Sequence, residues 1–337
     1  MEILSNYDLT KLNTFGISAR AKFFVQLDKE SELPELFASP EFKNNEKLFL
    51  GGGSNVLFTK DFDGIVVLNK LKGIEIPEEN SKSIVIKSMS GEIWHNLVLF
   101  SIERGYWGLE NLSSIPGTVG AAPMQNIGAY GAEIKNALEN IEAYRIFDGV
   151  KKIFKKEECQ FGYRDSIFKN KLKGEYFISA VTLKLSKIEK KNISYKSLAN
   201  YFVKHKIKIS HPKDVSDAVI FTRKSIFPDP KIIGNAGSFF QNVFVGKEKI
   251  QEMLAIYPQM PYFEEDKVTK IPAGWLIEQC GWKGKRVGNA GVHEKHSLVL
   301  VNYGGATGEE IKNLAEQIIA SVFSKFGLTL VPEVNLI

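Results

Sequence analysis

An α+β enzyme with two domains is the fold class that the sequence predicts. Short apolar segments of strand length alternate with short helical patterns and glycine-rich turns. The chain has 337 residues, 44% of them hydrophobic and 25% charged, which is ordinary globular composition and long enough for two or three cores. The sequence has no repeat period or low-complexity tract, which excludes disordered, collagen-like and coiled-coil architectures.

Strands dominate the first part of the chain. A strand over residues 47–50 runs into a glycine turn at 51–55, and a second short strand follows over 56–58. Apolar residues at helical spacing predict a helix over 91–104, ended by Gly105. Further strands are predicted over 64–71, 83–87 and 176–185, and the last alternates like a half-buried strand.

The second part opens with lysines and closes with a long helix. Seven lysines between Leu185 and Ile209 predict a solvated surface crossing, which separates a region of residues 1–187 from one of residues 188–337. A helix over 309–326 begins at the capping box of Thr307 and Glu310 and ends at Gly327. A final strand over 328–336 is expected to carry Glu333.

Net charge and cysteine content limit the classes of ligand and metal site that the sequence allows. The net charge of +5 comes from 44 basic and 39 acidic residues, so anionic ligands are slightly favoured and nucleic acid is not implied. Cys159 and Cys280 form no CxxC pair, which excludes a disulfide framework and a thiolate zinc site and fits a reducing compartment. No apolar run approaches the roughly 20 residues of a membrane-spanning helix. We expect a cytoplasmic monomer without a membrane or nucleic-acid partner.

Four common motifs are absent, and each absence excludes one class of binding site or enzyme. The turn GGGSN lacks the third small residue and the following helix of GxGxxG, so a Rossmann domain is not expected. No glycine stands five positions before either Gly-Lys pair, which excludes a P-loop. His293 and His296 are three residues apart instead of four, so no metal is expected. Neither Ser54 nor Ser238 lies in GxSxG, which excludes the hydrolase elbow.

Three polar segments rich in glycine and asparagine favour a large ligand with several phosphates. They are GLENLSSIPGTVGAAPMQNIGAYG at 108–131, FGYRDSIF at 161–168 and DPKIIGNAGSFFQN at 229–242. Glycines let backbone N–H groups approach a ligand closely and form nests for phosphate oxygens. The turn at 51–55 has the same composition, although loops of this kind are also common as structural turns.

These segments, with GGGSNVLF, AGWLIEQCGWKGKRVG and VPEV, resemble the UDP-N-acetylenolpyruvoylglucosamine reductases of bacterial cell-wall synthesis, in order and over nearly the whole chain. The resemblance implies a flavoenzyme with FAD that uses NADPH to reduce a UDP-sugar enolpyruvyl ether, UDP-N-acetylglucosamine enolpyruvate, to the peptidoglycan precursor UDP-N-acetylmuramate. It implies a vanillyl-alcohol-oxidase-type (PCMH-type) FAD-binding domain in residues 1–187, made of two subdomains, and a separate α+β substrate-binding domain in residues 188–337. A flavin domain of this type agrees with the missing GxGxxG.

Carried over motif by motif, the resemblance assigns roles to individual residues. The predicted cofactor-binding residues, which act chiefly through backbone groups around the diphosphate, are Gly51, Gly52, Gly53, Ser54, Asn55, Ile115, Pro116, Gly117, Gly120, Gln125, Asn126, Ile127 and Gly128. The predicted catalytic residues are Arg164, Ser238 as proton donor, and Glu333. The predicted substrate-binding residues are Tyr130, Tyr163, Tyr195, Asn242, Tyr262 and His296, where Tyr195 closes over the UDP moiety and Tyr262 stacks on the adenine of NADPH.

The reaction needs these residue types. Hydride delivered to an enolpyruvyl carbon leaves negative charge on the neighbouring carbon and its carboxylate, which the planar fork of Arg164 can stabilise. The Ser238 hydroxyl is a poor acid in water, but it can protonate a strongly basic carbanion. Glu333 can position Arg164, polarise a bound water or donate a proton, and the sequence leaves these three roles open. Taken singly, each residue is more often structural; only their joint occurrence in the motifs favours catalysis.

The chain departs from the family pattern at three positions, and two other functions stay open. Ile226 and Gln241 replace lysines, and His296 replaces an amide. Losing a cation near the diphosphate should weaken substrate binding, although a protonated His296 or Lys224 could replace the charge.

The alternative functions are an oxidase of the same flavin superfamily and a non-catalytic module that binds flavin or a nucleotide sugar. The oxidase is disfavoured because no His or Cys lies in a motif suited to covalent flavin attachment.

Overall fold

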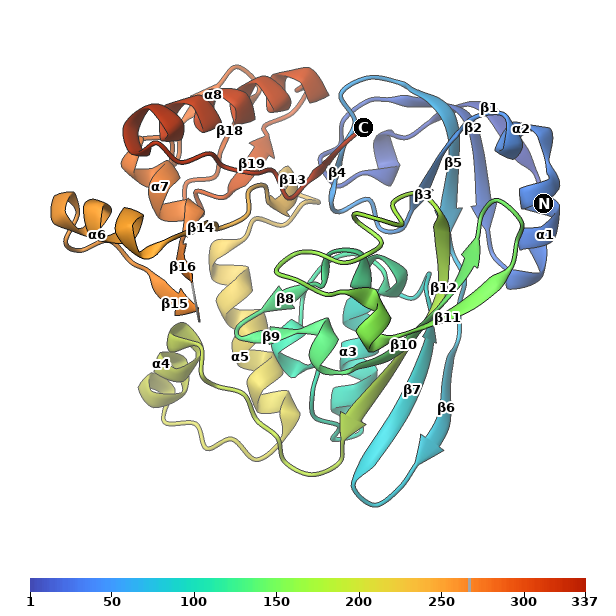
Figure 1. Cartoon of the computed structure of the whole chain (residues 1–337), viewed down its shortest axis with the longest axis horizontal. Helices are drawn as coiled ribbons and strands as arrows, with labels where there is room; N and C mark the ends of the chain where they lie inside the picture. The colour runs from blue at the N-terminus through green and yellow to red at the C-terminus, as the bar shows by residue number, and fades with distance from the viewer. Residues whose placement is uncertain (266–267) are drawn as a thin grey trace. The chain divides into compact units, whose positions relative to one another are not determined.

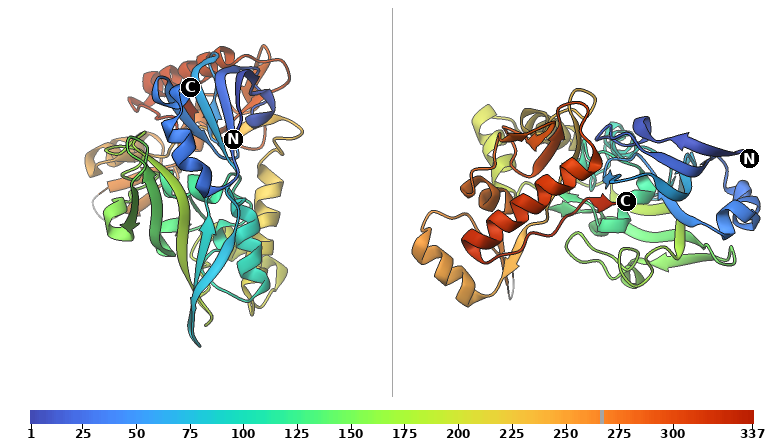
Figure 2. Two further views of the ribbon diagram at one scale, coloured as in Figure 1. Left: turned by 90° about the vertical axis from the view of Figure 1, so that its right-hand side faces the viewer. Right: turned by 90° about the horizontal axis from the view of Figure 1, so that it is seen from above.

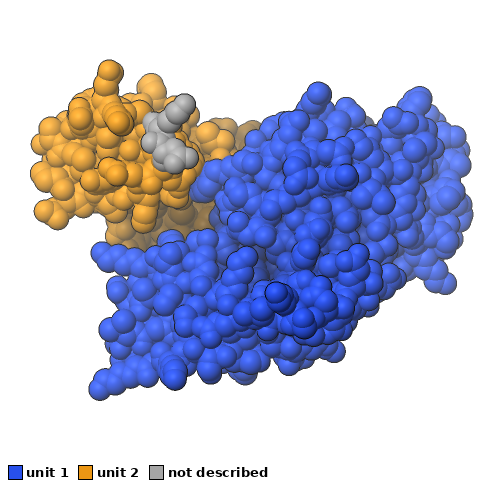
Figure 3. All heavy atoms as spheres, turned by 60° about the horizontal axis from the view of Figure 1, so that its bottom comes forward, with its two compact units in different colours: residues 1–7, 21–52, 63–225 blue, residues 8–20, 53–62, 226–337 orange. Residues whose placement is uncertain are grey.

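The computed structural model describes residues 1–265 and 268–337, which form two compact units (Figure 1, Figure 3). Unit 1 comprises Met1–Tyr7, Ala21–Gly52 and Asp63–Ser225, and unit 2 comprises Asp8–Arg20, Gly53–Phe62 and Ile226–Ile337. Each unit therefore combines segments that are distant in the sequence. The functional division at residue 187 stays a prediction; by their contacts, residues 188–225 pack with unit 1.

A four-stranded sheet in the order β1-β2-β5-β3 forms one part of unit 1. Its strands are β1 (Ile3–Asp8), β2 (Arg20–Leu27), β5 (Phe62–Asn69) and β3 (Glu46–Leu50). The short helices α1 (Leu33–Ala38) and α2 (Pro40–Lys43) bury Leu36 and Phe42 against apolar residues of β2 and β5. The strands predicted over 47–50 and 64–71 are confirmed.

A five-stranded antiparallel sheet, in the order β11-β10-β12-β7-β6, provides the larger core of unit 1. Its strands are β11 (Lys151–Lys155), β10 (Leu138–Arg145), β12 (Tyr176–Ser186), β7 (Ser83–Met89) and β6 (Ile74–Glu79). Helix α3 (Trp94–Glu103) lies against this sheet and buries Trp94 and Leu97 in the shared core (Figure 2). The predicted helix and the strands over 83–87 and 176–185 are confirmed. The half-buried pattern expected of the last strand is wrong, because residues 177–183 are all buried, with Phe177 in one hydrophobic core and Val181 in another.

The lysine-rich stretch forms part of a helical layer. All seven of its lysines are exposed, as predicted, but the stretch also contains helix α4 (Lys196–His205), which the sequence analysis does not identify. Together with α5 (Pro212–Ile226), α4 buries Leu198, Phe202 and Val219 around Trp107. Nearby, β8 (Gly128–Ala129) and β9 (Ala132–Glu133) form a tight hairpin whose tip is Tyr130 and Gly131.

Unit 2 contains two small antiparallel sheets, in the orders β13-β19-β18-β17 and β14-β16-β15. The first has β13 (Gly234–Ser238), β19 (Val299–Asn302), β18 (Ala290–Val292) and β17 (Arg286–Val287); the second has β14 (Val243–Val245), β16 (Val268–Ile271) and β15 (Phe263–Glu265). Its helices are α6 (Lys247–Ile256), α7 (Ala273–Gln279) and α8 (Gly308–Phe326). Helix α8 covers β18 and β19, begins at the predicted capping box and ends at Gly327 in the left-handed conformation (Figure 2).

The strand predicted over 328–336 is wrong for most of its length. Only β20 (Asn335–Leu336) is a strand, and it pairs in parallel with β4 (Val56–Leu57), which confirms the short strand predicted after the glycine turn. Upstream, Pro332 forms an isolated bridge with Phe240. Proline has no N–H to donate, so the ladder cannot continue through this residue.

A buried carboxyl group makes the stability of unit 1 depend on pH. Glu110 lies in a short 3-10 turn (Glu110–Leu112) and is 1% exposed. Its Oε2 atom accepts the backbone N–H of Gly108 at 2.6 Å. Burial raises the pKa of Glu110 above its ordinary value, while hydrogen bonds from neighbouring backbone N–H groups oppose this shift.

We expect the stability of Glu110→Gln relative to the native chain to rise with pH. The raised pKa means that the folded chain holds the proton more tightly than the unfolded chain does. The contribution of Glu110 to the free energy of unfolding is therefore complete below the unfolded-state pKa and is lost as the pH rises through the folded-state pKa. Each unit of elevation is worth about 1.4 kcal/mol. Urea unfolding at several pH values measures the difference, with the exposed Glu103→Gln as control. A difference between Glu110→Gln and native chain that stays constant with pH would contradict this account.

Candidate active site

The two predicted flavin loops contact each other in unit 1. A Cβ atom added to Gly51 would stand 2.3 Å from Oγ1 of Thr118, and one added to Gly52 would stand 3.0 Å from Cα of Gly117. Side chains at 51 and 52 would therefore push the loops apart, and glycine allows the two backbones to approach this closely. We call Gly51, Gly52 and Gly117 the glycine cradle. Exposed backbone N–H groups in a surface of this kind fit the diphosphate of FAD.

Backbone hydrogen bonds anchor the second flavin loop. The N–H of Trp94, at the start of α3, donates to the Gly117 carbonyl at 3.1 Å, and the N–H of Gly120 donates to the Ser90 carbonyl at 2.9 Å. A Cβ atom at Gly120 would lie 2.5 Å from Cβ of Ser90, so this approach also requires glycine. Among the predicted flavin residues of this loop, Gly120, Asn126 and Ile127 are buried, Ile115, Gly117, Gln125 and Gly128 are half-buried, and Pro116 is exposed.

The end of the first flavin loop belongs to unit 2, where it contacts the C-terminal segment. Gly53 has a φ of +62°, and a Cβ atom there would lie 1.9 Å from the Leu12 carbonyl oxygen. The Asn55 side chain donates to the Glu333 carbonyl at 3.3 Å, and the Asn55 carbonyl accepts the N–H of Asn335 at 3.1 Å. The predicted flavin residues Gly53, Ser54 and Asn55 therefore share this unit with the predicted catalytic glutamate.

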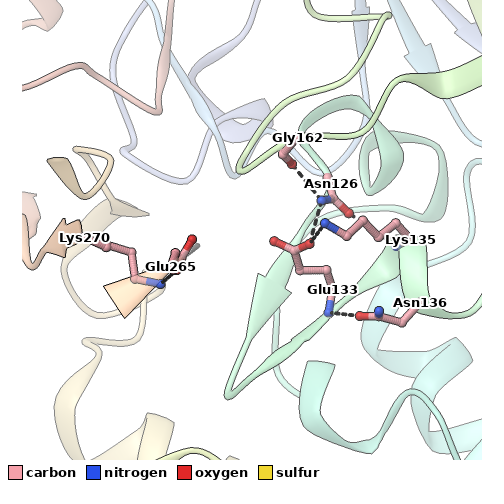
Figure 4. A network of polar contacts seen from close by, with 7 residues as sticks. All are labelled: Asn126, Glu133, Lys135, Asn136, Gly162, Glu265 and Lys270. Atoms are coloured by element: carbon pink, nitrogen blue, oxygen red, sulfur yellow. Dashed lines mark hydrogen bonds and ion pairs between the residues drawn. The ribbon is translucent and has the colours of Figure 1, made fainter. Parts of the chain in front are cut away.

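Asn126 connects the second flavin loop to the FGYRDSIF segment (Figure 4). Its side-chain amide donates to Oε2 of Glu133 at 3.0 Å and to the carbonyl of Gly162 at 2.8 Å. Its own side-chain oxygen accepts the N–H of Lys135 at 3.3 Å, and the Lys135 ammonium pairs with Glu133 at 2.6 Å. Asn126 itself has a φ of +45°, a conformation that these partners stabilise. Through its bond to Gly162, the same side chain holds the backbone two residues before Arg164.

Arg164 is oriented by the flavin loop. Its Nη2 atom donates to the Gly128 carbonyl at 2.7 Å, and its guanidinium carbon lies 5.4 Å from the centre of the Tyr163 ring. A Cβ atom at Gly128 would approach Nη1 of Arg164 to 2.9 Å. The structure thus brings together three predicted site residues from two segments, and it explains why position 128 holds glycine.

Two predicted substrate-binding tyrosines also meet in unit 1. The rings of Tyr130 and Tyr195 lie edge to face, with their centres 5.4 Å apart. Tyr130 has a φ of +48°, while Tyr195 immediately precedes helix α4 and is 43% exposed. Burial raises the pKa of Tyr130, and the positive charge of Arg223 acts in the opposite direction.

The motifs do not identify Arg223, which lies near the end of α5. Burial lowers the pKa of its guanidinium group, and the charge of Arg164 lowers it further. Arg223 therefore stands close enough to Arg164 and Tyr130 to interact with them electrostatically. One signal could have revealed it: Arg223 precedes Ile226 by three residues, about one helical turn, and Ile226 is the position where the sequence resemblance implies a lysine.

Ser238 and Glu333 are neighbours in unit 2. Ser238 ends β13, and the carbonyl of the next residue, Phe239, accepts the N–H of Glu333 at 2.7 Å. The N–H of Gln241 donates to the Val331 carbonyl at 2.9 Å, which holds the two segments alongside each other. Both Ser238 and Glu333 are half-buried. The structure therefore places the backbone of the predicted catalytic glutamate beside Phe239, the residue that follows the predicted proton donor.

The remaining predicted residues lie in separate parts of unit 2. Oδ1 of Asn242 accepts the N–H of Ala273, at the start of α7, at 3.1 Å. Tyr262 is 42% exposed and directly precedes β15. The His296 ring lies 4.5 Å from the ring of Phe227, and its Nδ1 atom accepts the N–H of Leu298 at 3.3 Å.

Residues 1–265 and 268–337 contain neither a candidate metal site nor a candidate membrane-spanning helix. No group of three or more His, Cys, Asp or Glu side chains in that part of the chain could hold a metal ion. Among the helices described there, none combines the length and the apolar composition required to cross a membrane.

Two family models match separate parts of the chain, and full-length relatives match all of it. Residues 21–155 match a family model described as an FAD binding domain, and residues 229–337 match the C-terminal domain of UDP-N-acetylenolpyruvoylglucosamine reductase. Proteins of that name from Flavobacterium johnsoniae and Amoebophilus asiaticus are 47% and 46% identical to the chain, and each match covers 100% of both sequences.

A solved structure supports the fold. The crystal structure of UDP-N-acetylenolpyruvylglucosamine reductase from Thermus caldophilus superimposes with a TM-score of 0.66 at 24% identity, covering 99% of this chain and 98% of that one. The predicted α+β class with a FAD-binding domain is therefore confirmed. The full-length identities show that the chain belongs to the UDP-N-acetylenolpyruvoylglucosamine reductase family.

Proposed function

We propose that the chain is a FAD-dependent oxidoreductase that uses NADPH to reduce UDP-N-acetylglucosamine enolpyruvate to UDP-N-acetylmuramate. The observation that carries this proposal is the 47% identity, from end to end, to a reductase named for the enolpyruvyl UDP-sugar. The reaction belongs to peptidoglycan precursor synthesis, and we expect it to take place in the cytoplasm, in a monomeric enzyme.

The glycine cradle supports the cofactor part of the proposal. FAD, when bound, carries hydride from NADPH to the enolpyruvyl carbon. Its diphosphate would lie against the backbone of Gly51, Gly52 and Gly117, which carry no side chains of their own and pack closely together. The Asn126 side chain is engaged by protein partners, so a flavin contact at that residue would come from its backbone.

Arg164 stabilises the charge that hydride transfer creates. The substrate carboxylate gains negative charge as the neighbouring carbon becomes a carbanion, and a guanidinium fork matches that carboxylate. The hydrogen bond from Arg164 to Gly128 orients the fork before substrate arrives, which lowers the cost of reorganisation in the transition state.

Ser238 supplies the proton that completes the reduction. Its hydroxyl donates to the carbanion, which is basic enough to take a proton from a weak acid. The backbone contact between Phe239 and Glu333 supports a role for Glu333 in the same step, by polarising a bound water or by donating a proton itself.

The substrate and NADPH are bound by aromatic, amide and cationic groups. The residues assigned to the UDP-sugar are Tyr130, Tyr163, Tyr195, Asn242 and His296, and Tyr262 is assigned to the adenine of NADPH. The charge missing at Ile226 comes from Arg223, which is partly buried on the same helix, whereas Lys224 is exposed. A guanidinium group suits a diphosphate because it donates several hydrogen bonds in one plane.

An anaerobic titration distinguishes this function from its two rivals. We expect a yellow protein that NADPH bleaches, and whose colour returns when the enolpyruvyl UDP-sugar is added. Rapid peroxide release in air without the UDP-sugar would instead support an oxidase. Flavin or nucleotide-sugar binding without turnover would support a binding module, and a colourless protein that FAD cannot reconstitute would contradict the proposal.

Ser238→Ala should separate the two half-reactions. Flavin bleaching by NADPH should keep its rate, because the serine takes part only after hydride leaves the flavin. Flavin re-oxidation by the UDP-sugar should slow by roughly 10² or more, the usual scale for losing a general acid. Stopped-flow absorbance measures both rates. An unchanged second rate would show that Ser238 has only a structural role.

Arg223→Ala should raise KM for the UDP-sugar by about 10-fold or more, the scale expected for hydrogen bonds to a charged group. The rate of flavin reduction by NADPH should not change. Lys224→Ala is the matched control, since it removes an exposed cation one position along the same helix. Equal effects of the two substitutions would show that general charge, not the position of Arg223, affects binding.

A further inference from the structure

We propose that Asn111 and Asn192 are positioning residues, which hold the segment before Tyr195 against the Tyr130 loop and so prepare both tyrosines for the UDP-sugar. We call this pair the asparagine clasp. The proposal rests on the substrate-binding role of Tyr195 in the proposed function. Asn111 lies within the segment at 108–131 but has no role assigned to it there, and Asn192 lies outside the quoted segments.

Asn111 connects two segments that are far apart in the sequence. It is 2% exposed, and its side-chain nitrogen donates to the Tyr130 carbonyl and to the Asn192 carbonyl, both at 2.9 Å. A primary amide has two N–H donors, so the two carbonyls use both of them. Because the amide is buried, water cannot easily replace either bond.

Asn192 closes the same connection from the other side. Its side-chain nitrogen donates to the Gly131 carbonyl at 2.9 Å, while its side-chain oxygen accepts the N–H and hydroxyl of Ser194 at 3.2 and 2.8 Å. Gly131 has a φ of +81°, and a Cβ atom there would lie 3.1 Å from Oγ of Ser194. The backbones of the two segments are therefore close. Three side-chain hydrogen bonds hold them together: two are donated by Asn111, to the carbonyls of Tyr130 and Asn192, and one is donated by Asn192 to the carbonyl of Gly131.

The clasp determines where the two tyrosine rings lie. Tyr130 directly precedes Gly131 and has a left-handed backbone, which is unfavourable for a tyrosine unless its surroundings compensate. The Asn111 bond to its carbonyl is part of that compensation. On the other segment, Ile193 packs on the same core as Tyr130, and Tyr195 follows two residues later with its ring against Tyr130.

A segment that is ordered before binding costs the ligand less free energy. If the clasp were absent, the substrate would have to order the chain before Tyr195 when it binds, and the apparent affinity would fall. NADPH would not be affected at this position, because Tyr262 of unit 2 is the residue assigned to it. The clasp should therefore influence KM for the UDP-sugar and leave the reduction of the flavin unchanged.

Two substitutions at Asn192 separate the clasp from the local turn. Asn192→Ala removes both sets of bonds, whereas Asn192→Asp keeps the acceptor for Ser194 and loses the donor to Gly131. We expect both variants to raise KM for the UDP-sugar about 3- to 10-fold, the scale of one or two lost hydrogen bonds, with flavin reduction by NADPH unchanged. The partly exposed Asn192 is preferred to Asn111, whose buried position could affect folding.

Asn80→Ala is the matched control. Asn80 makes the same kind of turn, in which its side-chain oxygen accepts the N–H of Lys82, two residues further on, but it lies between β6 and β7. It should leave KM unchanged. If Asn192→Asp behaves like the native chain while Asn192→Ala does not, the turn alone matters and the clasp is overturned.

Coupling to Tyr195 provides the decisive measurement. If the clasp acts through Tyr195, Asn192→Ala should change KM far less in a Tyr195→Ala background than in the native background. Additive effects would overturn the proposal.

Hydrogen exchange of residues 187–195 without substrate should be faster in Asn192→Ala, and unchanged exchange would also overturn the proposal. If exchange accelerates but Tyr195→Ala leaves KM unchanged, the substrate role of Tyr195 fails and the clasp is only structural. If Tyr195→Ala raises KM and Asn192→Ala does not, the clasp alone fails.

Discussion

A long irregular loop can support a site only where its buried backbone groups find hydrogen-bond partners, and this constraint governs the loop at residues 108–131. The Gly117 carbonyl and the Gly120 N–H meet it by bonding to the start of α3 and to the residue after β7. Once the loop is anchored in this way, the other site features of unit 1 follow. Gly51 and Gly52 of the glycine cradle pack against it, its Gly128 carbonyl orients Arg164, and its Asn111 amide bonds to the chain that leads to Tyr195.

Charge in unit 1 agrees with the chemistry of the proposed substrate. Arg164 and Arg223 influence each other electrostatically, and burial makes the charge of Arg223 costly. A partly buried cation is stabilised by an anionic ligand, and the substrate offers both a carboxylate and a diphosphate. The net charge of +5 only hinted at anionic ligands, because it says nothing about where the cations gather.

Elements with local signals were predicted well, and those without them were not. Helix α8 has a capping box and a terminal glycine within a few residues of its ends, so its limits could be derived from the sequence. Helix α4 has only Leu198 and Phe202 as buried residues among many lysines, which made it resemble a solvated crossing. The burial of β12 depends on the two hydrophobic cores that contain Phe177 and Val181, and the alternation along one strand cannot reveal what packs on its faces.

The sequence by itself determined the α+β class, the family resemblance and the residue types that the reaction needs, because glycine turns, caps and short motifs are encoded by neighbouring residues. Only the tertiary structure decided which of those residues meet. Asn111 bonds to residues 19 and 81 positions away, and Arg164 bonds to a carbonyl 36 positions away. Such contacts arise when distant segments pack on a common core, and no local pattern of residues records the distances between them.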